Sequence, residues 1–328
     1  MIPNKMRTTL TGAVVLAAAV VLVSSPAASA TPVAPPVAGV TQSPPTHQLS
    51  QAEVKRYWTP ERMRDAKPVI QDAVAGPVER RDASPVLTPG GDRFGNAEVA
   101  RPYTANFNSR VTGKIFFTDP RNGGGFVCSG SVMNSAGKSV VSTAAHCVFL
   151  GGPNEQVWSQ NLIFIPSYDN GADPLRTWSA ATYWIPTSYF NHGNDGVVHE
   201  DDVASVAIQQ LDGQRITDVA GGLGWVPNDS GAINGFTSYG YPQEFYGGQN
   251  QLWCLGNGRD AGGFNGVTFL FTNNCVIFGG WSGGPVINGS NQLLAVVSGG
   301  DRSTNTFYAR AANNTWVPVI QAAEAAGY

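Results

Sequence analysis

Short apolar runs alternate with turn signals along most of the chain from Val111 onward. The runs cover residues 113–118, 126–133, 138–145, 161–166, 202–208, 236–242, 267–271 and 292–300. Between them lie polar stretches such as NSAG and NGSN, which favour hairpin turns. Many short strands at this spacing, without intervening helices, predict a sandwich or a barrel. Only the final stretch, NNTWVPVIQAAEAA, predicts an amphipathic helix, with Asn314 or Thr315 as its N-cap.

The first 30 residues have the pattern of a targeting segment. Lys5 and Arg7 precede the apolar run LTGAVVLAAAVVLV, and SSPAASA follows it. A charged start, an apolar middle and a small-residue cleavage site predict a secretory signal peptide over residues 1–30. A membrane anchor is the alternative, but the run is short of the roughly 20 residues that a span requires.

The next segment, residues 31–108, differs in texture from the strand-rich part. It begins with the Pro-rich stretch TPVAPPVAGVTQSPP, which is typical of an extended linker. Two short helices are expected after it, one with a capping box at Ser50 and one with an N-cap at Thr59. We predict that this segment is a propeptide ahead of a folded domain at 109–328.

Charge also changes at this border. From Val111 onward, eight basic side chains stand against fifteen acidic ones, a net charge of −7, whereas residues 31–110 carry ten basic and eight acidic ones. A domain with this net negative charge binds nucleic acids and anionic membranes poorly, and we expect neither as a partner. The segment before the domain, which we call the leader, has a net positive charge, and this is compatible with its docking on the acidic domain. Arg81 and Arg110 are both candidate processing sites.

The four cysteines form an even set in a chain predicted to be exported. They are Cys128, Cys147, Cys254 and Cys275, and the spacing leaves all three pairings open. A zinc site is the alternative, but no pair has the C-x-x-C spacing. We therefore expect disulfides, with no metal and no cofactor.

The stretch FGGWSGGPV places Ser282 among four glycines. A serine hydroxyl becomes a strong nucleophile when a histidine takes its proton, and the chain has only His47, His146, His192 and His199. GWSGG also matches the nucleophile motif of α/β-hydrolases, but there the histidine follows the serine. No histidine follows Ser282, so that class is excluded.

The four histidines differ in their surroundings. His192 and His199 lie in the polar stretch NHGNDGVVHEDD, where a calcium site of Asp195, Glu200 and Asp201 would fit no known loop pattern. His146 ends an apolar run and is followed at once by Cys147. A disulfide beside it would fix its backbone, as a catalytic base requires.

STAAHC and GGWSGGPV resemble the histidine and serine signatures of the trypsin-like (chymotrypsin-fold) serine peptidases. SYGYP and QLWC resemble the bacterial branch that includes the V8-like glutamyl endopeptidases. The resemblance covers about residues 109–328. It implies an all-β fold of two antiparallel six-stranded β-barrels, here with a C-terminal helix and preceded by the signal peptide and propeptide.

The resemblance implies a role for each signature residue. His146 would be the general base and Ser282 the nucleophile, with Asp202 of the motif DVA holding His146 in its productive tautomer. Asp201 is the rival for that third position. The backbone N–H groups of Gly280 and Ser282 would form the oxyanion hole.

The same family implies the disulfides Cys128–Cys147 and Cys254–Cys275. It also places Val276, Ser298, Gly299 and Gly300 at the substrate pocket. Glutamyl endopeptidases carry a histidine near the place of Ser298, and trypsins an aspartate at the place of Val276. Both are missing here, so we expect an uncharged P1 residue.

Trp281 is a further departure, because most trypsin-like enzymes place an aspartate before the serine. That aspartate binds the new N-terminus, so the oxyanion loop here must be stabilised in another way. Taken together, the resemblance implies a monomeric, secreted serine endopeptidase that is made as a proenzyme and forms an acyl-enzyme. Its partners would be protein or peptide substrates and its own propeptide. The alternative is a catalytically silent homologue that acts as a secreted binding protein.

Overall fold

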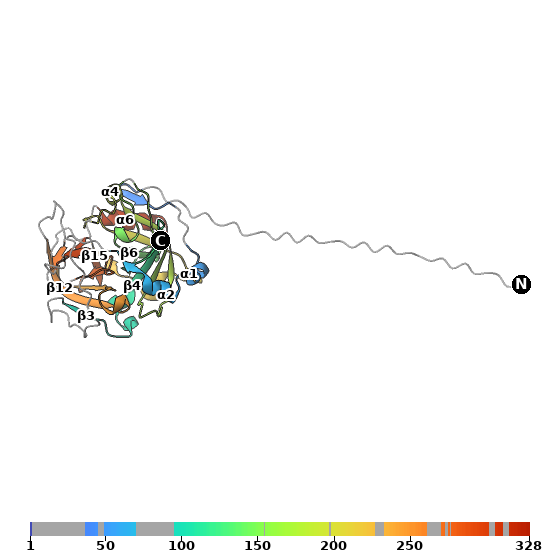
Figure 1. Ribbon diagram of the computed structural model, residues 1–328, viewed down its shortest axis with the longest axis horizontal. Coiled ribbons are helices and arrows are strands. Elements are labelled where there is room, and N and C mark those ends of the chain that lie inside the picture. The colour runs from blue at the N-terminus through green and yellow to red at the C-terminus, as the bar shows by residue number, and fades with distance from the viewer. Residues whose placement is uncertain are drawn as a thin grey trace. The chain divides into compact units, whose positions relative to one another are not determined.

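The computed structural model describes Met1 and most of the chain from residue 37 onward (Figure 1). The described ranges are 37–44, 49–69, 95–153, 155–196, 198–226, 233–260, 270–272, 275, 277–301, 306–310 and 315–328. The predicted signal peptide, apart from Met1, lies outside them, as do Asn314 and the candidate processing site Arg81.

The N-terminal barrel is a closed ring of six antiparallel strands. They are β4 (Thr112–Thr118), β5 (Gly125–Met133), β6 (Val140–Thr143), β7 (Gln160–Pro166), β8 (Trp178–Pro186) and β9 (Ala204–Ile208). The order around the ring is β4, β5, β6, β9, β8, β7, and β7 pairs again with β4. Ile115 and Phe117 belong to the main core and Phe116 to a second cluster, because successive side chains of a strand point to opposite faces.

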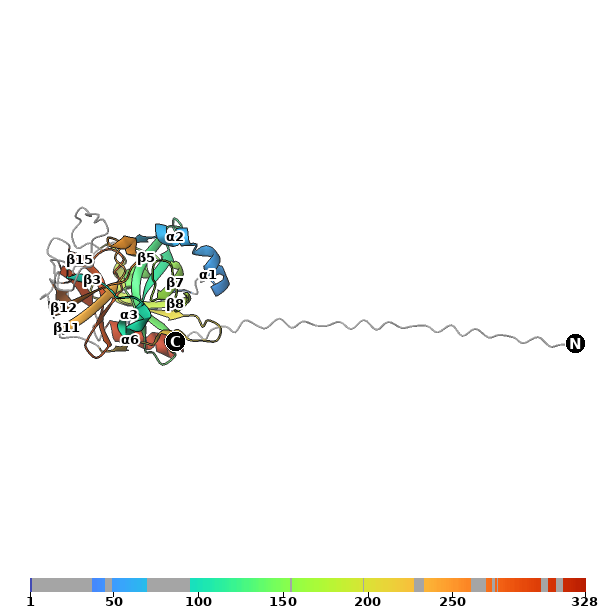
Figure 2. The same cartoon turned by 90° about the horizontal axis from the view of Figure 1, so that it is seen from below.

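The C-terminal barrel repeats this architecture. Its strands are β11 (Ile233–Gly240), β12 (Leu252–Asp260), β13 (Leu270–Thr272), β14 (Pro285–Ile287), β15 (Gln292–Asp301) and β16 (Thr306–Arg310). β15 pairs with both β14 and β16, which closes the ring through β11, β12 and β13. The predicted fold of two six-stranded antiparallel barrels is confirmed, and Figures 1 and 2 show the barrels side by side.

Short helices and strands surround the barrels. The helical elements are α1 (Gln51–Tyr57), α2 (Pro60–Asp65), η1 (Tyr103–Ala105), α3 (Phe107–Val111), η2 (Ala145–Cys147), α4 (Thr187–His192), α5 (Ile216–Ala220), η3 (Tyr246–Gly248) and α6 (Trp316–Ala325). The remaining strands are β1 (Val40–Gln42), β2 (Lys67–Pro68), β3 (Asn96–Glu98) and β10 (Gly224–Trp225). The predicted C-terminal helix is α6; it begins after Thr315 and packs on β8 and β9. Within the described ranges, no helix is long and apolar enough to cross a membrane.

Residues 37–44 and 49–69 cover the outside of the N-terminal barrel. β1 pairs with β8, and β2 pairs with β5. The predicted capping box forms, because the Ser50 N–H donates to Glu53 at 2.9 Å. Three leader side chains, Val54, Trp58 and Ala66, are buried against the second cluster. The barrel-side members of that cluster are Phe116, Val127, Ile163, Ile165, Tyr168 and Tyr241.

Residues 95–108 attach instead to the C-terminal barrel. β3 pairs with β12, with Ala97 opposite Trp253. Tyr103 is buried, and its hydroxyl accepts a hydrogen bond from the Gln251 N–H at 3.1 Å. The two parts of the leader therefore support different barrels, and residues 70–94 between them lie outside the described ranges.

Candidate active site

His146 lies where β6 ends and the single turn η2 begins. All four residues of β6 are buried, so the strand is fixed in the barrel wall up to this point. The next residue, Cys147, forms a disulfide with Cys128 of β5. The turn is thus held on both sides of the imidazole, which is itself fully buried.

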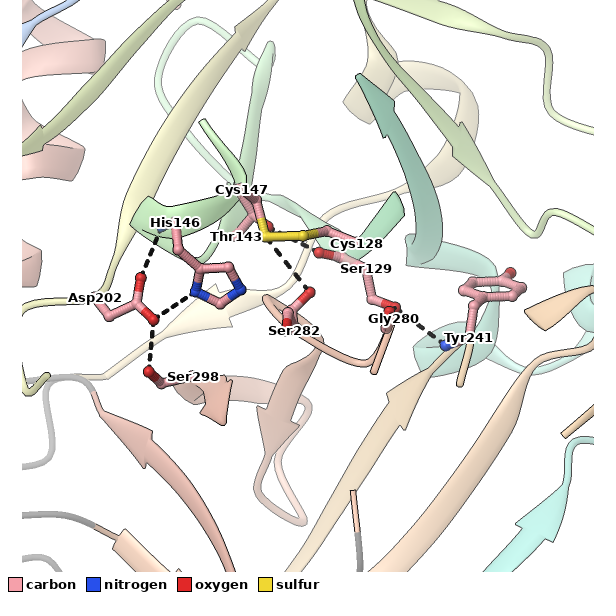
Figure 3. Close-up of a disulfide and its surroundings, with 10 residues drawn as sticks. All are labelled: Cys128, Ser129, Thr143, His146, Cys147, Asp202, Tyr241, Gly280, Ser282 and Ser298. Carbon is pink, nitrogen blue, oxygen red and sulfur yellow. Dashed lines mark hydrogen bonds and ion pairs between the residues drawn. A yellow bond between two sulfur atoms is a disulfide. The ribbon is translucent and has the colours of Figure 1, made fainter. Parts of the chain in front are cut away.

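Asp202 fixes the orientation of the imidazole (Figure 3). One carboxylate oxygen, Oδ1, accepts a hydrogen bond from the His146 backbone N–H at 2.9 Å. The other, Oδ2, lies 2.7 Å from Nδ1 of His146 and accepts a hydrogen bond from the Ser298 hydroxyl at 2.5 Å. All three residues are buried, so these contacts are shielded from water.

This contact decides which ring nitrogen is free. Because the Asp202 carboxylate is an acceptor, Nδ1 of a neutral His146 carries the hydrogen and Nε2 keeps its lone pair. In Figure 3, the ring edge with Nε2 is turned toward Ser282. Within the described part of the chain, Nε2 makes no hydrogen bond. Such bonds are often long in free enzymes, and a free, oriented Nε2 is what a general base requires.

Ser282 reaches this position because the glycines beside it allow a close approach between the barrels. Gly283 has φ +77°, and a Cβ there would lie 2.0 Å from Oγ1 of Thr143, at the end of β6. Gly280 has φ +99°, and a Cβ there would lie 2.5 Å from the Tyr241 carbonyl oxygen. Only glycine satisfies both demands at these positions.

The oxyanion-hole candidates have unused backbone donors. Among the described residues, neither the Gly280 N–H nor the Ser282 N–H donates a hydrogen bond to another group. The flanking amides are occupied: Trp281 donates to Phe278 and Gly283 donates to Val297. Free, fixed N–H groups beside a nucleophile suit a developing negative charge.

Ser129 holds this loop from the opposite barrel, a role that the sequence analysis missed. Its N–H donates to the Ser282 carbonyl and its hydroxyl to the Gly280 carbonyl, both at 2.8 Å. The hydroxyl also accepts from the Tyr241 N–H at 3.1 Å. Ser129 thus restrains the peptide unit before Trp281 and the peptide unit after Ser282. The signal in the sequence was a hydroxyl directly after Cys128, in a strand whose other polar side chain is Ser131.

Trp281 anchors the loop on its other side. The side chain is fully buried, and its indole N–H donates to the Ser238 hydroxyl of β11 at 3.1 Å. The ring lies against Gly240, where a Cβ would approach it to 2.4 Å. Neutral hydrogen bonds and packing therefore hold the loop where trypsin-like enzymes use an ion pair.

The rival aspartate points elsewhere. Oδ1 of Asp201 lies 3.0 Å from Nε2 of His192, so this side chain pairs with a different histidine. Burial raises the pKa of Asp201, but hydrogen bonds from His192 and Ser188 outweigh it and leave the pKa below its usual value. Burial likewise lowers the pKa of His192, and the contact with Asp201 reverses that change, so the net pKa is raised. Asp195 lies 2.9 Å from His199.

The pocket candidates lie on β15, except for one. Ser298 touches Asp202, and Gly299 and Gly300 pair with Tyr308 and Phe307 of β16. Val276 lies outside the described residues. Its neighbour Cys275 forms a disulfide with Cys254 of β12.

Lys114 is a buried cation between the barrels that the sequence analysis did not single out. Its Nζ donates to the Gly248 carbonyl at 2.7 Å and lies 5.0 Å from the ring centres of Phe116 and Tyr168. Burial lowers the pKa of Lys114 to about 7. It joins β4 to η3 of the other barrel.

Comparisons with known proteins place this geometry in a family. No family model matches the chain, and no curated protein matches it either. Among solved structures, it is similar to the protease Anisep from Arthrobacter nicotinovorans, with 33% identity over 62% of this chain and 90% of that chain and a TM-score of 0.51. It is also similar to the thermostable serine protease AL20 from an extremophilic microorganism, with 25% identity over 67% and 97% of the two chains and a TM-score of 0.55.

A third likeness concerns the fold alone. A Glu endopeptidase matches with 18% identity over 72% of this chain and 98% of that chain, with a TM-score of 0.55. The fold of two barrels and the similarity to bacterial proteases define the class. The chain belongs to the trypsin-like (chymotrypsin-fold) serine peptidases.

Proposed function

We propose that the protein is a secreted serine endopeptidase whose triad is His146, Asp202 and Ser282. The observation that carries the proposal is the buried His146–Asp202 contact, which leaves Nε2 free on the side of Ser282. Family membership supports the reaction class.

The proposed reaction begins when Oγ of Ser282 attacks the carbonyl carbon of a peptide bond. Nε2 of His146 takes the hydroxyl proton, and Asp202 stabilises the resulting imidazolium. The negative charge that develops on the carbonyl oxygen would be met by the N–H groups of Gly280 and Ser282. His146 then gives its proton to the leaving amine, and water hydrolyses the acyl-enzyme by the same steps.

The preference for an uncharged P1 residue remains part of the proposal. Ser298 donates its hydroxyl to Asp202 and so is engaged with the triad rather than with a substrate carboxylate. A panel of peptides that differ only at P1 tests this. Strong preference for Glu or Arg would contradict it.

The contacts of the leader lead us to propose an earlier end for the propeptide than the predicted residue 108. Cleavage after Arg110 would detach β3 from β12 and release Tyr103 from its buried site. The cut would also fall at Arg110 itself, whose side-chain Nε–H donates to the Ala220 carbonyl at 3.0 Å. These contacts favour a processing site between residues 69 and 95, such as Arg81, and a mature chain that keeps residues 95–108.

The contacts of residues 37–69 suggest how the propeptide acts. Val54, Trp58 and Ala66 pack on the outer face of the N-terminal barrel, and Figure 1 shows α1 on the side away from the C-terminal barrel. A segment placed there suits assistance of folding better than blockage of a cleft between barrels. Secretion rests on the signal-peptide pattern and is consistent with the two disulfides.

The first test is intact-mass analysis of the secreted protein before and after a fluorophosphonate probe. We expect one adduct on the wild type, one on the control Ser290→Ala in an exposed turn, and none on Ser282→Ala. The same spectrum gives the mature N-terminus. A folded, processed wild type without an adduct would favour the silent binding homologue instead.

A further inference from the structure

A cluster of histidine and aspartate side chains lies at the end of α4 and in the segment that leads to Asp202. His192, His199 and Asp201 each offer a ligand atom, and these atoms all lie within 4.8 Å of one another. The two imidazole rings are stacked, with their centres 3.8 Å apart. Imidazole nitrogens and carboxylate oxygens are the ligand types that divalent transition metals such as zinc take from proteins.

The orientation of His192 supports a cation at this place. Its Nδ1 lies 2.8 Å from the Gly193 carbonyl oxygen, which can only accept, so Nδ1 carries the hydrogen. In the neutral ring, Nε2 is then a lone pair that faces Oδ1 of Asp201 at 3.0 Å. Two acceptors at this distance require a positive charge between them, either a proton or a metal ion.

His199 has the complementary outer partner. Its Nε2 lies 2.9 Å from Oδ1 of Asp195, and a carboxylate accepts the hydrogen of that nitrogen. Nδ1 of His199 is then the nitrogen available to a metal. A carbonyl behind one histidine and a carboxylate behind the other are the partners that orient metal-binding imidazoles.

We propose that His192, His199 and Asp201 bind a divalent transition metal of the zinc class. Two nitrogens and one carboxylate oxygen fill three positions of a tetrahedral site and leave the fourth for water. Calcium fits less well, because it prefers six to eight oxygen ligands. The sequence analysis expected no metal, so this site departs from that expectation.

The site is joined to Asp202 through the backbone. The Asp202 N–H donates to the His199 carbonyl at 3.3 Å, and the Val203 N–H donates to the Asp201 carbonyl at 2.8 Å. Metal binding would therefore restrain the segment that carries Asp202. The binding itself does not depend on the proposed reaction.

Zinc titration of the full chain tests the proposal, with Ser282→Ala as the background so that any self-digestion is avoided. We expect one zinc ion per chain, and at least about a hundredfold weaker binding in His192→Gln and in His199→Gln. Asp195→Asn removes only an outer partner and is expected to weaken binding by about tenfold to a hundredfold. His47→Ala serves as the control and should bind as the background protein does.

Cobalt substitution provides a second readout that does not rely on stability. A four-coordinate site gives Co²⁺ an intense visible absorption, which should disappear in His192→Gln with its circular dichroism unchanged. Zinc affinity that is equal in all folded variants would overturn the proposal. So would the pale spectrum of hydrated Co²⁺, or no saturable binding at all.

Discussion

In the N-terminal barrel, His146 and Asp202 are already hydrogen-bonded to each other and buried, and each lies beside a barrel strand. In the C-terminal barrel, Ser282 lies on a glycine-rich loop whose carbonyls are held by Ser129 of the opposite barrel. The proposed acid–base half of the site is thus built largely within one barrel. The half that carries the proposed nucleophile depends on contacts from both.

This difference indicates which contacts hold each half of the site in position. Asp202 does receive one bond from the C-terminal barrel, through Ser298, but its two bonds to His146 are made within its own barrel. The leader increases this difference, because residues 37–44 and 49–69 pack mainly on the N-terminal barrel. We therefore expect substitutions in the N-terminal half to change proton transfer or the free energy of unfolding. Substitutions that affect the loop should change the position of Ser282 relative to His146.

The largest effect is expected from Asp202→Asn. The amide would present an N–H donor to Nδ1, which places the hydrogen of the neutral ring on Nε2. This unproductive tautomer costs about 10⁴-fold in kcat in such triads. Asp201→Asn leaves the His146 contact in place and should lose less than about tenfold. Steady-state kinetics on one peptide substrate measure both. Equal losses in the two variants would contradict the assignment of Asp202.

Trp58→Ala tests the support from the leader. Trp58 is buried against Phe116, and its indole N–H donates to the Asn161 carbonyl at 2.8 Å. Removal of a buried aromatic side chain typically lowers the free energy of unfolding by about 3–5 kcal/mol. Denaturant unfolding of the unprocessed chain measures this, with the exposed Lys55→Ala on the same helix as control. An unchanged midpoint in Trp58→Ala would mean that the leader does not stabilise the barrel.

Ser129→Ala tests the bridge between the barrels. The Gly280 carbonyl and the Tyr241 N–H lose their hydroxyl partner, while the backbone bond to the Ser282 carbonyl remains. We expect kcat to fall about tenfold to a hundredfold with KM little changed. Ser131→Ala is the matched control, since the Ser131 hydroxyl lies buried on the same strand and has no hydrogen-bond partner among the described residues. If both variants retain full kcat, Ser129 is not a positioning residue.

Lys114→Met tests the buried amine between the barrels through the pH dependence of the free energy of unfolding. The pKa of Lys114 is about 7 in the folded chain and near 10.5 when unfolded, so the unfolded chain binds more protons between these values. The unfolding free energy of the wild type relative to Lys114→Met should therefore rise with pH across that window, by up to about 1.4 kcal/mol per pH unit. If the difference in unfolding free energy between the wild type and Lys114→Met is constant from pH 7 to 10, the lysine is not desolvated.

The sequence predicted the fold well because its signals are local. Alternating apolar runs and turn residues specify strands, and the signatures around His146 and Ser282 carry the family resemblance. The capping box at Ser50 and the C-terminal helix after Thr315 also form as expected. The proposed roles of the site residues remain predictions.

What the sequence could not predict depends on contacts between distant segments. The pairing of β3 with β12, over 150 residues away, has no local pattern that would separate it from the turn-rich leader. Ser129 and Lys114 likewise acquire meaning only when the second barrel lies against them. The cluster of His192, His199 and Asp201 follows no spacing motif, because His192 ends α4 while His199 and Asp201 lie in the segment before β9.

The bridge made by Ser129 also limits how such a protein can be recombined. A chimaera that takes its N-terminal barrel from one relative and its C-terminal barrel from another would inherit the strand serine and the loop carbonyls from different parents. Ser129 bonds to backbone groups of the loop, so this contact constrains the path of the loop rather than the identity of its side chains. The seam of a functional hybrid is therefore expected to lie where it keeps β5 and the segment around Ser282 from the same parent.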